Sequence, residues 1–275
     1  MLTITDILII LALGSIGGFI SGLLGVGGGI IYIPILDYFL YKTGLHDDAL
    51  VKGILANSLF TIIFSGSVAS FHQYKSGNFY PKEIVNTAIP GMISALLLTW
   101  FIRNGSWYSK DVFRMVFACM LLIIASRLFL KKTNSNGTID NPVSVLWPYR
   151  ITGIFAGFIT ALSGLGGGVI MTPVFTDILK QSFKKASSIS NGVIPLFAFC
   201  VGLYSLSDSE AIRVHQWQIG YIILPVVVPL ILATFIATPA GVRMSHKTNP
   251  TALRYIFASF VSLIFFKTLY EILFN

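Results

Sequence analysis

Long apolar stretches, separated by short polar segments, dominate this 275-residue sequence and limit what it can fold into. They lie near residues 5–24, 29–41, 50–71, 83–102, 112–130, 147–163, 168–179, 187–206, 217–239 and 252–273. A helix needs about 20 mostly apolar residues to cross the hydrocarbon of a bilayer, and most of these stretches approach that length. Only 11% of the residues are charged, against about 25% in a typical soluble domain. The chain is therefore predicted to be an all-α polytopic membrane protein.

The formal net charge of +8 comes from Lys and Arg residues that lie mostly between the apolar stretches. Topology signals of membrane proteins have this distribution, so nucleic acid is not an expected partner. The sequence contains no HExxH, GxSxG or nucleotide-binding P-loop motif and no cluster of Cys and His. We therefore expect no enzyme activity, no bound metal and no cofactor.

One seventeen-residue segment occurs twice. GFISGLLGVGGGIIYIP, at Gly18–Pro34, aligns without gaps on GFITALSGLGGGVIMTP, at Gly157–Pro173, with ten identical positions. The next match aligns Asn57 with Asn191. The polar stretch 131–146 separates two halves, so we predict a first transmembrane repeat at 1–130, a linker at 131–146 and a second repeat at 147–275. Internal repeats favour a transporter with its substrate site between the halves; gene duplication without a transport role is the alternative.

The number of crossings depends on the two glycine-rich segments. If each is one bent span, there are eight crossings and the halves are parallel. If each reverses the chain, there are ten and the halves are inverted about a pseudo-twofold axis. The division of Lys and Arg between the two faces is 11 to 8 in the first version and 12 to 7 in the second, so the positive-inside rule does not separate them. The stretches 29–41 and 168–179 are too short for full spans, which favours the inverted version. Both versions place the two termini on the outer face.

The glycine breaks are also the strongest chemical signal. A helix N-terminus carries partial positive charge and undonated N–H groups, and glycines let an anion approach the backbone. Broken helices in a membrane persist where they line a cavity. Two of them meeting near the midplane would bind a small oxyanion; close helix packing through small residues is the alternative. The predicted backbone site consists of Gly25, Gly27, Gly28, Gly29, Gly164, Gly166, Gly167 and Gly168.

Several polar residues inside or beside the apolar stretches are further candidates. An amide or hydroxyl inside a bundle either donates to a ligand or bonds a neighbouring helix, and this group contains Asn57, Ser58, Ser190 and Asn191. Ionisable residues near the membrane are candidates for coupling or charge recognition, and this group contains Asp37, Asp177, Lys52 and Lys185. Solvated helix ends are the alternative for the aspartates, and snorkelling or topology is the alternative for the lysines.

The sequence resembles the TauE/SafE (TSUP) family of membrane exporters for sulfite and organosulfonates. The resemblance rests on GLLGVGGGIIYIPIL, on SGLGGGVIMTPVF and on the segments around Asn57 and Asn191, and it covers essentially the whole chain. It implies secondary transport of small sulfur-containing anions, such as sulfite or sulfoacetate, out of the cell across the cytoplasmic membrane of a prokaryote. Proton coupling, a homodimer, a passive anion channel, import of another small organic anion and an assembly role without transport stay open.

Overall fold

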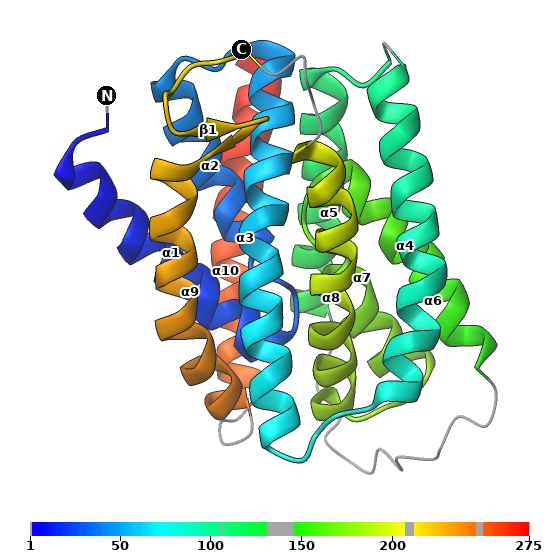
Figure 1. Cartoon of the computed structure of the whole chain (residues 1–275). Coiled ribbons are helices and arrows are strands. Elements are labelled where there is room, and N and C mark those ends of the chain that lie inside the picture. The colour runs from blue at the N-terminus through cyan, green and yellow to red at the C-terminus, as the bar shows by residue number, and fades with distance from the viewer. Residues whose placement is uncertain (1, 106, 131–145, 207–211, 246–249, 275) are drawn as a thin grey trace.

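The computed structural model describes residues 2–105, 107–130, 146–206, 212–245 and 250–274, and these are almost entirely helical (Figure 1). The first half contains α1 (Ile4–Leu24), α2 (Gly29–Thr43), α3 (Asp47–Lys75), α4 (Pro81–Asn104) and α5 (Lys110–Leu130). The second half contains α6 (Trp147–Ser163), α7 (Gly168–Pro173), the π-helical turn η1 (Val174–Ile178), α8 (Phe183–Leu206), the short antiparallel strands β1 (Gln218–Ile219) and β2 (Ile222–Ile223), α9 (Leu224–Ser245) and α10 (Pro250–Phe274). The predicted all-α class is confirmed. Most of the predicted linker, 131–145, lies outside the described residues.

Five of the described helices, α1, α3, α4, α8 and α9, are long and apolar enough to cross a membrane. Their outward faces carry large apolar side chains. On α4, for example, Ile89, Ile93 and Leu97 follow one another at a spacing of four residues, and each is more than half exposed. Water would disfavour such a stripe, whereas lipid chains would cover it. The chain is a multi-pass membrane protein.

The two halves pack across one another in a reciprocal way. The first helix of each half lies along the fourth helix of the other half, so that α1 packs on α9 and α6 packs on α4. The third helices, α3 and α8, pack together in the middle, and the fifth helices, α5 and α10, pack together beside them. Corresponding elements therefore occupy corresponding places.

The central helices α3 and α8 run in opposite directions (Figure 1). Just after α3 ends, the Nδ2 of Asn78 donates to the carbonyl of Lys184 at the start of α8, at 3.1 Å. At the other end of the molecule, Gly44, which precedes α3, lies beside Val214, which follows α8. Equivalent helices with opposite directions are what an inverted repeat of five elements requires.

Two seams of glycine bring helix backbones into direct contact. Between α4 and α6, a Cβ on Gly157 would lie 2.0 Å from the carbonyl oxygen of Gly91. Between α1 and α9, a Cβ on Gly22 would lie 2.3 Å from the carbonyl oxygen of Thr238. Both distances are far inside van der Waals contact, so only glycine fits. Close packing through small residues thus accounts for glycines in the first part of each repeated segment.

Candidate functional site

The two glycine breaks fold into matching turns. The chain leaves α1 after Leu24 and re-enters a helix at Gly29, and it leaves α6 after Ser163 and re-enters at Gly168. In both turns the first three of the four glycines have positive φ angles, which side chains with a Cβ rarely tolerate. These angles are 69°, 88° and 76° at Gly25, Gly27 and Gly28, and 67°, 81° and 72° at Gly164, Gly166 and Gly167.

The breaks contact each other in the interior of the molecule. A Cβ on Gly29 would lie 2.9 Å from the Cα of Leu165, and a Cβ on Gly168 would lie 2.5 Å from the carbonyl oxygen of Gly25. All the glycines of both breaks are buried. The two breaks therefore lie against each other, which is the arrangement that the predicted anion site requires.

Carbonyl groups of the breaks are held by hydroxyls, in two cases from the opposite half. Ser58 donates to the Gly164 carbonyl at 2.9 Å, and Thr172 donates to the Gly25 carbonyl at 3.2 Å. Thr172 also lies 3.1 Å from Ser190, oxygen to oxygen. Ser65 donates to the Gly27 carbonyl at 3.2 Å. These hydrogen bonds fix the geometry of the breaks and use the three carbonyl acceptors. The N–H donors of the breaks are not used by them.

The N–H groups at the two helix starts have no acceptor in the described part of the chain. The first amide bonds of α2 are donated by Ile31 and Tyr32 to Gly28, and those of α7 by Ile170 and Met171 to Gly167. The amides just before these donors, those of residues 28–30 and 167–169, lie before the first helical bond. A buried N–H without an acceptor costs free energy, so such a pair of helix starts is suited to an anion.

Unpartnered hydroxyls gather at the first break. Of the described residues, Tyr32 and Ser187 are among those whose buried oxygen has no hydrogen-bond partner. The Cζ of Tyr32 lies 2.8 Å from the Cβ position of Gly28, and the Oγ of Ser187 lies 2.7 Å from that of Gly25. At the second break the hydroxyl of Thr160 donates to its own helix, at 2.7 Å. The two breaks therefore share a backbone but differ in side-chain chemistry.

Two isoleucines occupy the space between the breaks. The side chain of Ile62 reaches 3.1 Å from the Cβ positions of both Gly29 and Gly166. The side chain of Ile194 makes the equivalent contacts, 2.5 Å at Gly168 and 3.2 Å at Gly27. Both isoleucines are fully buried, so apolar atoms close the centre in this conformation. The sequence analysis did not single out either residue.

The side-chain amide of Asn57 forms hydrogen bonds within the protein and has no group left for a ligand. Its Nδ2 donates to the carbonyls of Gly53 and Tyr221, both at 2.7 Å, and its Oδ1 accepts from the N–H of Ile223 at 2.9 Å. It thereby fastens the segment before α9 to α3. Asn191 is equally buried, but neither atom of its amide has a partner in the described residues.

The contacts at the breaks also show that Asn57 and Asn191 are not equivalent positions. Ile62 and Ile194 make corresponding contacts, and the register that superposes them also places Ser58 on Ser190. In that register Asn57 falls on Ile189, not on Asn191. The structural equivalent of Ser58 is therefore Ser190, and the match of asparagines in the sequence is shifted by two positions.

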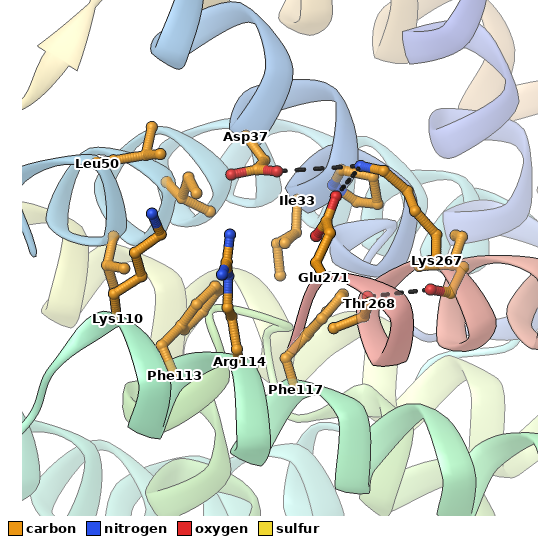
Figure 2. A pocket seen from close by; sticks show the side chains of 14 residues that line it. Ile33, Asp37, Leu50, Lys110, Phe113, Arg114, Phe117, Lys267, Thr268 and Glu271 are labelled. Carbon is orange, nitrogen blue, oxygen red and sulfur yellow. Dashed lines mark hydrogen bonds and ion pairs between the residues drawn. The ribbon is translucent and has the colours of Figure 1, made fainter. Parts of the chain in front are cut away.

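The charged candidates lie away from the breaks. Lys52 is exposed at the start of α3, whereas Lys185 is buried, 3.3 Å from a carboxylate oxygen of Glu83 and 5.0 Å from the ring centre of Tyr80. Asp37 lines a cavity, where its carboxylate lies 4.0 Å from the Nζ of Lys267 (Figure 2). Asp177 forms an ion pair with Arg127. Neither aspartate is only a solvated helix end.

Comparison with known proteins agrees with this architecture. The family model described as "Sulfite exporter TauE/SafE" matches residues 10–268, which include both breaks. A probable membrane transporter protein of Methanocaldococcus jannaschii is 26% identical over 258 residues, covering 93% of this chain and 92% of that protein. One from Haemophilus influenzae is 27% identical over 270 residues, covering 94% and 97%, and one from Bacillus subtilis is 24% identical over 281 residues, covering 97% and 98%. No solved structure matches the chain. The chain belongs to the sulfite exporter TauE/SafE family, and its relatives in these organisms are named probable membrane transporter proteins.

Proposed function

We propose that this protein is a secondary transporter that exports small sulfur-containing anions, such as sulfite or a small organosulfonate, across the cytoplasmic membrane by alternating access. The observation that supports this proposal is the first glycine break, where buried N–H groups have no acceptor among the described residues. Tyr32 lies against Gly28 of this break and Ser187 against Gly25, and the hydroxyls of both residues lack a hydrogen-bond partner there. The site would hold the anion between the two halves, because Ser187 belongs to the second half and Tyr32 to the first.

The chemistry of the break favours a small oxyanion. Sulfite and sulfonates carry several oxygens on one sulfur, and each oxygen accepts N–H and O–H donors. The amides of a helix start supply such donors together with the positive end of the helix dipole. No Lys or Arg occurs in either repeated segment, so the donors there are neutral. An anion held by neutral donors can leave again more readily than one held by a fixed cation, as a transporter requires.

The closed centre favours a carrier over a passive channel. Ile62 and Ile194 fill the space between the two breaks, so an anion crosses only if these side chains move. An inverted pair of halves supplies such a movement, because rocking one half against the other opens the site to one face at a time. In the inverted version of the topology the sequence divides Lys and Arg 12 to 7 between the two faces, and we assign the more basic face to the cytoplasm.

Flux of sulfite through purified protein in liposomes tests the proposal. We expect the parent to release trapped sulfite and the double variant Tyr32→Phe with Ser187→Ala to require a higher sulfite concentration for the same rate. Each hydrogen bond to a charged group contributes about 1.5–3 kcal/mol, which corresponds to roughly a ten-fold or larger change per hydroxyl. Thr160→Val is the matched control at the second break, since its hydroxyl is bonded within its own helix. No sulfite or sulfonate flux in the parent would refute the proposed substrate.

A change of the breaks themselves gives a second test. Gly28→Leu combined with Gly167→Leu places side chains where both φ angles are positive and where aromatic or backbone atoms already lie. We expect no transport from this variant. If it folds and transports at the parent rate, the anion does not bind at the breaks. A dependence of flux on an imposed pH gradient would distinguish a proton-coupled carrier from an uncoupled one.

A further inference from the structure

A cavity bounded by α2, α3, α5 and α10 lies on the side of α2 that leads away from the break (Figure 2). Its inner wall includes Ile33 and Pro34, one helical turn beyond Gly29. Its remaining lining includes three cations, Lys110, Arg114 and Lys267, and two carboxylates, Asp37 and Glu271. The cavity therefore carries an excess of positive charge close to the proposed anion path.

Arg114 faces Asp37 across this cavity, but among the described residues it has no hydrogen bond or ion pair. Lys267 lies 3.1 Å from Glu271 and 4.0 Å from Asp37, and Lys110 lies 3.9 Å from Asp47. The guanidinium of Arg114, in contrast, has no hydrogen bond or ion pair with any residue that the structure describes, and its side chain reaches into the cavity beside Asp37 (Figure 2). An unpaired guanidinium in a half-enclosed cavity is suited to the two oxygens of an oxyanion.

We propose that this cavity is a second anion site, in which Arg114 binds the exported oxyanion between the glycine break and the outer face. The inference deepens the proposed function, because it assigns a residue to the last part of the same path. Asp37 and Glu271 share Lys267, so the N–H donors of Arg114 are the ones in this cavity that no described residue uses, and they are the donors offered to an oxyanion. Such a site would raise the local anion concentration at the exit without contacting the breaks.

Calorimetric titration of the purified protein with sulfite, at low and at high concentrations of potassium chloride, tests this assignment. We expect Arg114→Gln to remove one binding event and to weaken the salt dependence of the remaining one, since a fixed charge acts over about 10 Å or less in salt. Arg114→Lys is the matched variant, which keeps the charge and loses the planar fork, and it should retain weakened binding. In liposomes, Arg114→Gln should raise the half-saturating sulfite concentration and leave the rate at saturation near the parent value.

The outcomes separate the two proposals. Binding that is identical in parent and Arg114→Gln, with flux intact, overturns the Arg114 site and leaves the proposed function standing. A parent that binds no sulfite counts against both. If Arg114→Gln fails to fold, the sulfite affinities of Arg114→Lys and of Lys110→Gln decide, because only the first variant should bind more weakly than the parent.

Two ion pairs at equivalent places in the two halves support a second inference. Each half-helix beyond a glycine break reaches an aspartate that pairs with a cation on the fifth helix of the other half. Asp37 on α2 pairs with Lys267 on α10, and Asp177 on η1 pairs with Arg127 on α5. When the starts of α5 and α10 are aligned without gaps, Arg127 falls on Lys267, so the two cations are equivalent.

The aspartates are equivalent as well, although the sequence places them one position apart. In the register that aligns the glycines of the two breaks, Asp37 falls on Thr176, the residue just before Asp177. The π-helical turn η1, in which the N–H of Leu179 donates to the carbonyl of Val174 at 3.1 Å, accommodates the extra position in the second half-helix. This single turn brings Asp177 to the place that faces Arg127.

The two pairs lie at opposite ends of the molecule and differ in the other contacts of their cations. At the Asp37 end, Lys267 is shared with Glu271 and the cavity lies alongside. At the Asp177 end, Arg127 contacts Asp177 directly and also donates to the Pro173 carbonyl at 3.0 Å. We infer that the pairs are alternating latches: the Asp177 latch is closed and the Asp37 latch loosened in this conformation, and the opposite holds when the site faces the other side. This inference also rests on alternating access.

Reaction of introduced cysteines with a membrane-impermeant maleimide tests the latches without any transport measurement. In a background with Cys119→Ser and Cys200→Ser, the reporters are Pro34→Cys, beside the Asp37 latch, and Pro173→Cys, at the equivalent position beside the other. We expect the Pro34→Cys reporter to react faster in otherwise unchanged protein. Asp177→Asn should speed the reaction of the Pro173→Cys reporter and slow that of the Pro34→Cys reporter.

The exchanged pair Asp177→Arg with Arg127→Asp should restore the original order of reactivity, because it restores the ion pair with the charges reversed. If Asp177→Asn does not fold, Arg127→Gln opens the same latch from the other side. Reporter rates that are unchanged in both Asp177→Asn and Arg127→Gln would overturn the latch inference. That result would leave sulfite flux and the Arg114 site unaffected, so the failures are distinguishable.

Discussion

The contrast between Asn57 and Asn191 gives the sharpest test of the structure. The sequence aligns these residues, yet the structure gives Asn57 three hydrogen bonds and Asn191 none among the described residues. Both are completely buried. Replacement by leucine, which has a similar size and no polar atom, removes the amide with little change of volume, so the variants differ mainly in the bonds that are lost.

For Asn57→Leu, the free energy of unfolding should fall by about 2–4 kcal/mol, since three intramolecular hydrogen bonds contribute roughly 0.5–1.5 kcal/mol each. The lost hydrogen bonds are those that attach the segment before α9 to α3. For Asn191→Leu no protein hydrogen bond is lost, and removal of an unpartnered buried amide should leave the stability unchanged or raise it by about 1 kcal/mol or more. The expected difference in the free energy of unfolding between the two variants is therefore large enough to measure.

Unfolding of the purified variants by sodium dodecyl sulfate in mixed micelles, followed by tryptophan fluorescence and far-ultraviolet circular dichroism, measures these free energies. The measurement is made without sulfite, because a bound anion would stabilise the folded state on its own. Equal destabilisation by the two substitutions would refute the reasoning, because it would mean that the asparagines are equivalent after all. A larger loss for Asn191→Leu than for Asn57→Leu would do so even more directly.

Three further predictions concern packing, charge and the closed centre. Gly157→Ala should prevent stable folding, because its Cβ would lie 2.0 Å from a carbonyl oxygen, whereas Gly202→Ala, whose nearest neighbour is a side-chain atom at 3.3 Å, should be tolerated; the yield of monodisperse protein after detergent extraction compares them. Lys185→Met should lower the free energy of unfolding by about 3 kcal/mol, because it leaves the partly buried carboxylate of Glu83 without its cation, and adding Glu83→Gln should recover most of the loss; no recovery would contradict the ion pair. Ile194→Ala should give an anion leak that does not saturate with sulfite concentration, since the substitution opens the space between the breaks, and an unchanged, saturable flux in liposomes would show that this side chain does not close the path.

Much of the architecture was accessible from the sequence because it depends on local chemistry. Apolar stretches of the right length and the scarcity of charge indicate membrane helices in any tertiary context. The glycine breaks were equally readable, since Gly25, Gly27, Gly28 and their counterparts adopt backbone angles that other residues avoid. The sequence also indicated that the chain turns at these places, because stretches 29–41 and 168–179 are too short for complete spans.

The residues of the proposed sites were only partly accessible from the sequence. The sequence pointed to Ser58, Ser190, Asn57 and Asn191 because polar groups in apolar stretches are conspicuous, but it did not separate the structural bonds of Asn57 from the unpartnered amide of Asn191. Tyr32 and Ser187 were missed because neither adjoins a glycine in the sequence; only the fold places Tyr32 against Gly28 and Ser187 against Gly25. Arg114 was also missed, although the gapless alignment of α5 with α10 places it opposite Arg254 and would have marked both.

The sequence by itself therefore determined the membrane class, the duplication and the positions of the two breaks, because length, hydropathy and glycine act locally. Only the tertiary structure decided the register of the repeat. In the folded structure Ser58 and Ser190 occupy equivalent positions, and the π-helical turn η1 places Asp177 opposite Arg127. Register depends on which face each helix buries against the other half, and a shift of one or two residues rotates that face by roughly 100° or roughly 200° without altering composition or hydropathy.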